Sequence, residues 1–168
     1  AREILSNIEG CKYILFDLPE VLTRSQFLLS TRFPYKKIAS LKELKKYKYD
    51  MGKLVKDFDV IFLPAWHVTS IPENMNVDLW LNTHSLGEMP VEIARRYCEA
   101  MDKTGKACVL INRNRDLPFG KDNVIHDTRK FLSVFTRMKV REISYPITSN
   151  YMTLRPSNVR LFLDVEKS

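Results

Sequence analysis

Cysteine and long apolar runs are both scarce in this sequence of 168 residues. Its three cysteines, Cys11, Cys98 and Cys108, are odd in number and stand among apolar residues. No CxxC or Cys/His spacing suggests zinc, so we expect buried free thiols in a reducing compartment, by default the cytoplasm. No apolar run approaches the roughly 20 residues that span a bilayer, and the N-terminus lacks the form of a signal peptide.

Glycine is scarce as well. The chain has five glycines, and they never approach a GxGxG spacing, which excludes a glycine-rich phosphate loop of that form within the chain. The rest of the composition is ordinary for a folded protein, with 45% hydrophobic and 28% charged residues. The length allows one domain with a sizeable core, which we assign to residues 1–168.

The net charge of +7 invites a nucleic-acid hypothesis. Much of the excess lies in the basic segment 36–56, where Ser40-Leu41-Lys42-Glu43 has the form of a capping box and apolar residues recur at near-helical spacing. The lysines are therefore expected on the solvent-exposed face of an amphipathic helix. The segment also has few arginines and no interleaved aromatic platform, so nucleic acid is not the expected partner.

Apolar runs alternate with helical patterns along the chain, which predicts an α/β fold with a mostly parallel sheet. The expected strands are 13–16, 37–39, 59–63, 77–82 and 107–111, with a final pair at 140–145 and 159–165. The expected helices are 2–8, stopped near Gly10, then 19–31, the basic segment, 90–101 and 128–138. Their core-facing residues are expected to be Val21, Leu22, Leu28, Leu29, Ile93, Ala94, Tyr97, Met101, Phe131, Leu132 and Phe135.

A lone carboxylate, Asp17, ends the first apolar run, and Pro19 then opens a helix. In open α/β sheets ligands bind at the carboxyl ends of the strands, where an acid commonly holds the two hydroxyls of a nucleotide ribose. The alternative is that Asp17 is a helix N-cap or first-turn acid. Position alone leaves both interpretations open.

Two strings resemble a known family. FDLPEVL, residues 16–22, resembles the second-strand motif of S-adenosylmethionine (SAM)-dependent O-methyltransferases, whose acid holds the cofactor ribose. VDLWLNTHSLGEM, residues 77–89, is similar to the Asn-x-x-Ser-x-x-Glu-Met motif on the fourth strand of the sugar O-methyltransferase family. The resemblance covers nearly the whole chain. It implies a Rossmann-like class I methyltransferase sheet with a C-terminal antiparallel hairpin, SAM as cofactor, and a small-molecule or glycan acceptor.

In that family the first strand lies at the centre of the sheet and carries a glycine-rich turn for the methionine end of SAM. No such strand precedes the helix that stops near Gly10. Without it, strands 13–16 and 77–82 would each have an unpaired apolar edge. We therefore expect an N-terminally incomplete domain, which is either part of a longer protein or completed by a separate piece. A homo-oligomer is also compatible with the sequence.

Strand 77–82 turns polar at its carboxyl end. Methyl transfer requires an acceptor oxygen that is positioned and relieved of its proton, a task that suits histidine near neutral pH. We assign His84 as general base, Glu88 as its orienter or a ligand of a sugar hydroxyl, Asn82 to the cofactor and Ser85 to the acceptor. The alternative is that His84 caps the following helix or satisfies loop carbonyls, and that Glu88 is a first-turn helix acid.

In the methyltransferases that the chain resembles, the loop that corresponds to the one after strand 59–63 flanks the adenine of SAM. Leu18 and Ala65 are assigned to the cofactor with Trp66, which either stacks on the adenine or belongs to the core. Many methyltransferases place an acid in this loop for the adenine amino group, and this chain has Ala65-Trp66 instead. His67 is an alternative base.

Three further polar residues lie at the carboxyl ends of later strands. Asn112, Arg113 and Tyr145 are assigned to the acceptor, with an exposed loop or simple packing as the alternatives. The strand ends lack a cluster of carboxylates, so no metal is expected. Two other functions stay open: an RNA methyltransferase that uses the basic 36–56 helix, and a non-catalytic scaffold module of methyltransferase-like fold.

Overall fold

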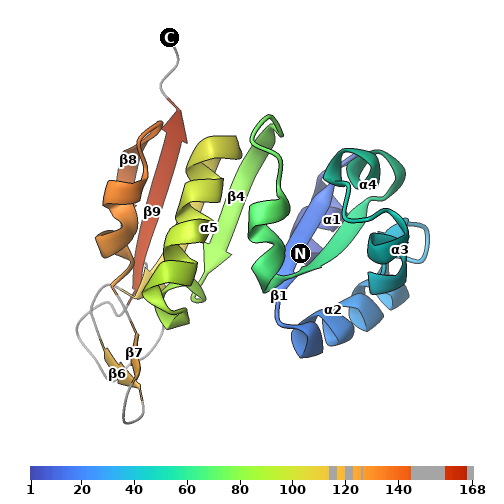
Figure 1. Ribbon diagram of the computed structural model, residues 1–168, viewed down its shortest axis with the longest axis horizontal. Helices are drawn as coiled ribbons and strands as arrows, with labels where there is room; N and C mark the ends of the chain where they lie inside the picture. Colours follow the sequence, from blue (N-terminus) through green and yellow to red (C-terminus); the bar gives the residue numbers. More distant parts are fainter. Residues whose placement is uncertain (114–116, 120–122, 126, 145–157, 166–168) are drawn as a thin grey trace. The chain divides into compact units, whose positions relative to one another are not determined.

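The computed structural model describes residues 1–113, 117–119, 123–125, 127–144 and 158–165 (Figure 1). The described contacts divide the chain into unit 1, residues 1–72, and unit 2, residues 73–168. The expectation of one domain over the whole chain stays a prediction.

Unit 1 is a small parallel sheet covered by helices. Its strands lie in the order β1-β3-β2, with Tyr13 opposite Val60 and Asp17 opposite Pro64. All five residues of β3 are buried, as an apolar run in the middle of a covered sheet requires. The elements are α1 (Arg2–Asn7), β1 (Tyr13–Asp17), α2 (Pro19–Arg32), β2 (Ile38–Ala39), α3 (Leu41–Lys46), α4 (Met51–Asp57), β3 (Val60–Pro64) and the 3₁₀ helix η1 (Ala65–Ser70).

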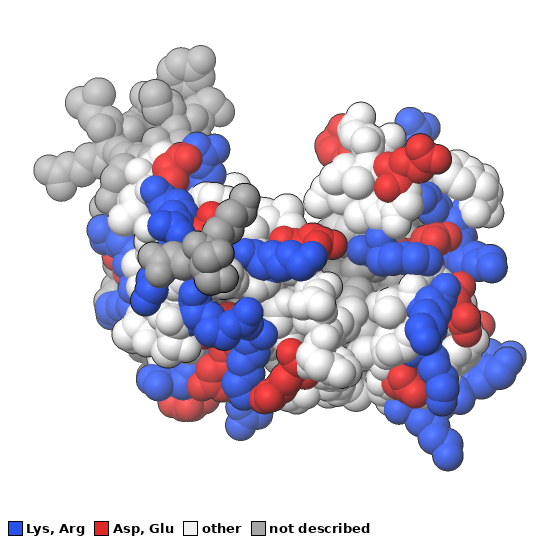
Figure 2. All heavy atoms as spheres, turned by 90° about the horizontal axis from the view of Figure 1, so that it is seen from above, with Lys and Arg blue, Asp and Glu red and all other residues white. Residues whose placement is uncertain are grey.

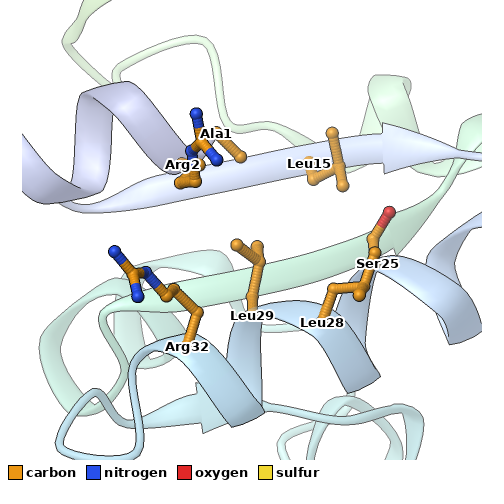
Figure 3. Close-up of a pocket in the computed structure, with 7 residues that line it drawn as sticks. All are labelled: Ala1, Arg2, Leu15, Ser25, Leu28, Leu29 and Arg32. Carbon is orange, nitrogen blue, oxygen red and sulfur yellow. The ribbon is translucent and has the colours of Figure 1, made fainter.

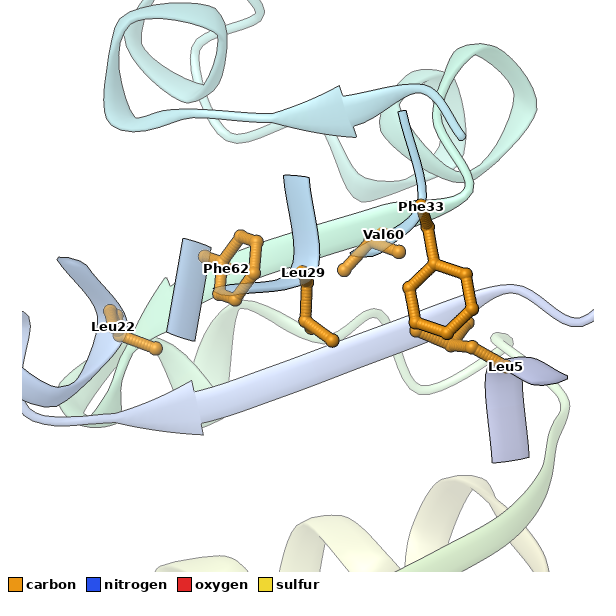
Figure 4. Close-up of a cluster of buried hydrophobic side chains, with 6 residues drawn as sticks. All are labelled: Leu5, Leu22, Leu29, Phe33, Val60 and Phe62. Atoms are coloured by element: carbon orange, nitrogen blue, oxygen red, sulfur yellow. The ribbon is translucent and has the colours of Figure 1, made fainter. Parts of the chain in front are cut away.

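The core of unit 1 joins α1 and α2 to the sheet (Figure 4). Its buried members are Leu5, Leu22, Leu29, Phe33, Val60 and Phe62. The prediction that Val21 and Leu28 also face inward is wrong, because their side chains are 40% and 63% exposed. Leu22 and Leu29 are seven residues apart and form one stripe, and the residue before each is turned by about 100° away from it. α1 ends at Asn7 with Ile8 as its C-cap, so Gly10 is not the residue that stops the helix; with φ +68° it lies in a turn three residues after the helix end.

The basic segment forms two helices where one was predicted. The capping box at Ser40 and Glu43 is present, and Leu44, Met51 and Leu54 are buried as an amphipathic pattern requires. Lys48 and Tyr49, however, have φ values of +50° and +57°, which ends α3 and begins a new helix at α4. Left-handed residues cannot continue a right-handed helix.

Unit 2 is a mixed sheet in the order β4-β5-β9-β8. β4 and β5 are parallel, while β9 pairs antiparallel with both β5 and β8, which confirms the predicted terminal strand pair. The elements are β4 (Val77–Thr83), the 3₁₀ helix η2 (Leu86–Glu88), α5 (Val91–Thr104), β5 (Gly105–Arg113), β6 (Leu117–Phe119), β7 (Asn123–Ile125), the 3₁₀ helix η3 (Thr128–Val134), β8 (Met138–Ser144) and β9 (Asn158–Val165).

Two predictions for unit 2 need correction. Ile93 is 36% exposed, although Ala94, Tyr97 and Met101 are buried as expected. The predicted helix 128–138 is a 3₁₀ helix that ends at Val134. The backbone amides at 136–138 donate instead to the Asp102 carboxylate on α5, so they are not available for helical bonds.

Both sheets have an open side among the described residues. β1 pairs only with β3, and β4 pairs only with β5. Exposure alternates along β4: Leu79 and Leu81 are 49% and 44% exposed, whereas Trp80 and Asn82 are buried. Among the described residues, no helix combines the length and apolar character that crossing a bilayer requires.

Candidate functional site

The carboxyl end of β1 places Asp17 where parallel neighbouring strands end together. Asp17 lies opposite Pro64 of β3, and its Oδ1 accepts a hydrogen bond from the Leu18 amide at 2.8 Å. Leu18, 57% exposed, is itself the N-cap residue of α2, so the alternative that Asp17 is the N-cap is wrong. A carboxylate has about four acceptor positions, and Oδ2 makes no hydrogen bond within the described chain. Asp17 can therefore still accept two hydroxyl donors.

The loop after β3 presents an aromatic side chain. Trp66 is 61% exposed, which excludes the alternative that it is a core residue. Ala65 precedes it directly after Pro64, the residue opposite Asp17. The carboxylate and the indole thus follow two adjacent strands at the same edge of the sheet, the edge at which such sheets bind ligands.

His67, the residue after Trp66 in η1, packs against the rest of unit 1. The His67 ring stacks on Tyr49 with centroids 4.2 Å apart and planes 13° apart, and its Nδ1 lies within hydrogen-bond distance of Ser70 Oγ at 3.1 Å. Trp66 and His67 have ring centroids 6.2 Å apart. His67 is therefore engaged in packing, although its predicted role as an alternative base stays untested.

A cavity of about 580 Å³ in unit 1 lies elsewhere, between α1, β1 and α2 (Figure 3). Its apolar lining is Leu15, Leu28 and Leu29, and the side chains of Arg2 and Arg32 lie at one end. None of the predicted site residues lines it. The cavity is thus separate from the Asp17 edge.

In unit 2, the ends of β4 and β5 are joined by side-chain amides. Asn82 Oδ1 accepts hydrogen bonds from Asn112 Nδ2 at 3.0 Å and from the Leu86 amide at 3.3 Å. Asn82 Nδ2 donates to Ser85 Oγ at 2.6 Å. Asn82 is 8% exposed and Asn112 is fully buried, so both assigned residues are parts of a buried network that fixes the loop after β4. Among the described residues, Asn112 Oδ1 meets no hydrogen-bond donor.

His84 stands at the turn that this network fixes. Its φ is +67°, a left-handed conformation that histidine adopts more readily than most residues, and its amide donates to the Ile111 carbonyl of β5 at 2.8 Å. The imidazole is exposed, as is Glu88 in η2, and no hydrogen bond joins these two described side chains. Their predicted roles as base and orienter stay predictions.

Two assigned residues cannot be placed. The side chain of Arg113 and the whole of Tyr145 lie outside the described residues. Within the described part of the chain, no group of three or more His, Cys, Asp or Glu side chains is arranged to hold a metal ion. The expectation of no metal stays a prediction.

Basic side chains are spread over the surface. On the face in Figure 2, Lys and Arg alternate with Asp, Glu and uncharged residues. The amphipathic pattern of the basic segment predicts that its lysines are exposed to solvent. This holds for Lys42, Lys45, Lys46, Lys48 and Lys56. Lys53 forms an ion pair with Asp50.

The sequence reasoning missed Tyr49 as a neighbour of the site. It lies 18 residues before His67, in a segment interpreted as continuous helix, and no local pattern marks its contact with that ring. The pairing of Asn82 with Asn112 was likewise missed, although each was singled out. It could have been inferred from the expectation that strands 77–82 and 107–111 are neighbours.

Comparison with known proteins supports the fold. No model of a protein family matches the chain, and no curated protein matches it either. Among solved structures it is similar to the Mitomycin 7-O-methyltransferase MmcR, with TM-score 0.58 and 13% identity over 98% of this chain and 45% of that chain. It is also similar to LaPhzM, with TM-score 0.54 and 11% identity over 98% of this chain and 46% of that chain.

A third similar structure is the PH0226 protein from Pyrococcus horikoshii OT3, with TM-score 0.50 and 8% identity over 98% of this chain and 87% of that chain. The chain spans less than half the length of the first two. At these identities the likeness shows the fold alone. The fold is the α/β fold of class I methyltransferase structures, with parallel strands and a mixed sheet that ends in antiparallel strands.

Proposed function

We propose that this chain is the SAM- and acceptor-binding part of an O-methyltransferase. The observation that carries the proposal is Asp17, half-buried at the carboxyl end of β1, with Oδ2 making no bond within the described chain. An acid at this position of an α/β sheet suits the two hydroxyls of a ribose. The class I methyltransferase fold and the FDLPEVL string support the same assignment.

Unit 1 offers contacts for the adenosine half of SAM. Asp17 accepts from the ribose hydroxyls, and the exposed Trp66 indole stacks on the base, an interaction that any purine face can make. The chain has no GxGxG turn for the methionine half. When bound, SAM supplies an electrophilic methyl group.

Unit 2 offers residues for the acceptor. We assign the exposed imidazole of His84 to take the proton of the acceptor hydroxyl, and Glu88 to orient that imidazole or to bind a sugar hydroxyl. Ser85 offers a hydroxyl of the kind that binds sugars, and the buried Asn82 and Asn112 amides fix the loop that carries it. A sugar or a sugar-containing molecule is the acceptor class that the motif at 77–89 favours.

An RNA acceptor is the second candidate, because five lysines of unit 1 are exposed and make no ion pair in the described chain. A basic surface of this kind binds phosphates in a salt-dependent way. A non-catalytic scaffold module is the third. The RNA acceptor and the scaffold module each lead to a different expected result in the binding experiment below.

The test is calorimetric titration of the chain with SAM and with S-adenosylhomocysteine, using Asp17→Ala and a matched control, Glu20→Ala. Hydrogen bonds to a charged group contribute about 1.5–3 kcal/mol, so Asp17→Ala should weaken binding by about 10- to 150-fold. Glu20 is an exposed acid in the first turn of α2, three residues after Asp17, and its removal should change affinity by less than about twofold.

The outcomes separate the candidates. Equal affinity in Asp17→Ala and wild type would refute the ribose assignment, and absence of SAM binding by the chain would leave the scaffold function. Binding of a single-stranded RNA that weakens steeply with salt would favour the RNA acceptor. His84→Gln should keep cofactor affinity and lose methyl transfer to a sugar acceptor; transfer at the wild-type rate would refute the base assignment.

A further inference from the structure

The turn between α3 and α4 holds two consecutive residues in a conformation that they rarely adopt. Lys48 and Tyr49 have φ values of +50° and +57°, and neither is glycine or asparagine. A side chain with a Cβ atom is strained in this region. Such strain persists where the surrounding structure over-determines it, and it clusters at functional sites.

Local hydrogen bonds shape the turn but do not explain the choice of tyrosine. The Tyr49 amide donates to the Leu44 carbonyl at 3.0 Å, and the Lys48 amide donates to the Lys45 carbonyl at 3.0 Å. Asp50 then caps α4 by accepting from the Lys53 amide at 3.1 Å. The two turn bonds involve backbone atoms alone, so glycine would make them without strain.

The Tyr49 side chain makes the contact that glycine could not. Its ring lies flat on the His67 ring, with centroids 4.2 Å apart and planes 13° apart. His67 is preceded in η1 by Trp66, whose ring centroid lies 6.2 Å from that of His67. A turn distant in sequence thus holds the short helix that carries the exposed indole.

We propose that Tyr49 is a positioning residue for the nucleobase platform: its ring, stacked on His67, holds η1 so that Trp66 stays aligned for stacking on the base. The proposal rests on the proposed function, since it takes the adenine of SAM as the ligand of Trp66. It deepens that function by naming a residue that acts on the ligand only through its neighbour. The tyrosine ring is required here and its hydroxyl is not.

The experiment uses four variants of the chain. Tyr49→Phe keeps the ring. Tyr49→Gly removes the ring and relieves the left-handed strain, so that loss of binding cannot be attributed to a worse backbone. Trp66→Phe identifies the Trp66 signal. Tyr35→Leu is the matched control, because Tyr35 is a 72% exposed tyrosine of the same unit whose ring contacts Phe33.

Two quantities are measured in each variant: affinity for S-adenosylhomocysteine, and the ¹⁹F NMR signal of Trp66 in protein labelled with 5-fluorotryptophan. The chain has two tryptophans, so the signal missing from Trp66→Phe is assigned directly. Tyr49→Phe and Tyr35→Leu should keep the wild-type affinity within about twofold. Tyr49→Gly should weaken it by about 2- to 10-fold, the range that aromatic stacking contributes, and should shift and sharpen the Trp66 signal without ligand.

The results separate this proposal from the proposed function. If wild type binds and Tyr49→Gly binds equally well, the positioning role is refuted while the methyltransferase assignment stands. If wild type does not bind S-adenosylhomocysteine, the proposed function of the chain fails, and the ligand-free Trp66 signal still decides whether Tyr49 orders η1. An unchanged signal in Tyr49→Gly overturns the proposal in either case.

Discussion

Asp102 is the buried carboxylate whose replacement should destabilise unit 2 most clearly. It lies on α5, is 4% exposed, and faces the segment that leads into β8. Its oxygens accept hydrogen bonds from the Thr136 amide and hydroxyl at 2.9 and 2.8 Å, the Arg137 amide at 3.0 and 3.1 Å, and the Met138 amide at 2.9 Å. Asp102→Asn keeps the shape but turns one acceptor into a donor.

The magnitude follows from the bonds lost. The new amide nitrogen would face at least two donors that are then left unpaired, at about 1–3 kcal/mol each. The free energy of unfolding should therefore fall by about 2–6 kcal/mol. At a urea m-value of about 2 kcal/mol/M, in the middle of the range for small proteins, the midpoint should fall by about 1–3 M.

Urea unfolding should be followed by Trp80 fluorescence in a Trp66→Phe background, because buried Trp80 then reports on unit 2 alone. The matched control is Asp78→Asn, which breaks an ion pair with Lys106 in which the Asp78 side chain is 86% exposed. Such surface pairs contribute about 0–1 kcal/mol. If Asp102→Asn is as mild as Asp78→Asn, the carboxylate does not hold β8 to α5 and the reasoning is refuted.

The same carboxylate predicts how stability depends on pH. Burial raises the pKa of Asp102, but the hydrogen bonds from Met138, Thr136 and Arg137 outweigh it and leave that pKa below its ordinary value. The unfolded chain therefore binds its proton first as pH falls below about 3.9. The contribution of Asp102 is fully present above that pH and is lost as pH falls through the lowered folded-state pKa. In Asp102→Asn, acid unfolding should be correspondingly less steep.

Two further predictions concern packing. Gly105→Ala should lower the free energy of unfolding by about 1–3 kcal/mol, because a Cβ there would lie 2.8 Å from the Met101 carbonyl oxygen; an unchanged urea midpoint would contradict this. Cys98 and Cys108 are buried as expected, whereas Cys11 is only partly buried, which corrects the expectation of three buried thiols. Burial raises the pKa of Cys98 to about 12 and also raises that of Cys108, so Cys11 alone should react with Ellman's reagent at pH 8 in the folded protein, and all three thiols after denaturation. Reaction of all three in the native state would refute the burial argument.

Local sequence was sufficient for most of the elements. Uninterrupted apolar runs predicted β1, β3 and β5, because a strand covered on both faces needs apolar side chains at every position. The capping box at Ser40 and a chain turn at Gly10 could also be predicted, since each depends on residues within one turn. Asp17 could be selected as a site residue for the same reason: a strand end, an acid and a helix start follow one another in the chain.

Tertiary structure alone decided the rest. The sequence could not predict that the basic segment breaks at Lys48 and Tyr49, because the stacking on His67 that accompanies the break joins residues 18 positions apart. Nor could it show that Asn82 and Asn112 share a hydrogen bond, that Trp66 is exposed, or that Asp102 takes the amides that would have extended η3. Each of these features depends on which residues far apart in the sequence come into contact in the folded chain. Periodicity records only which face of an element is apolar, and a hydrogen bond or ring contact between elements requires the folded chain.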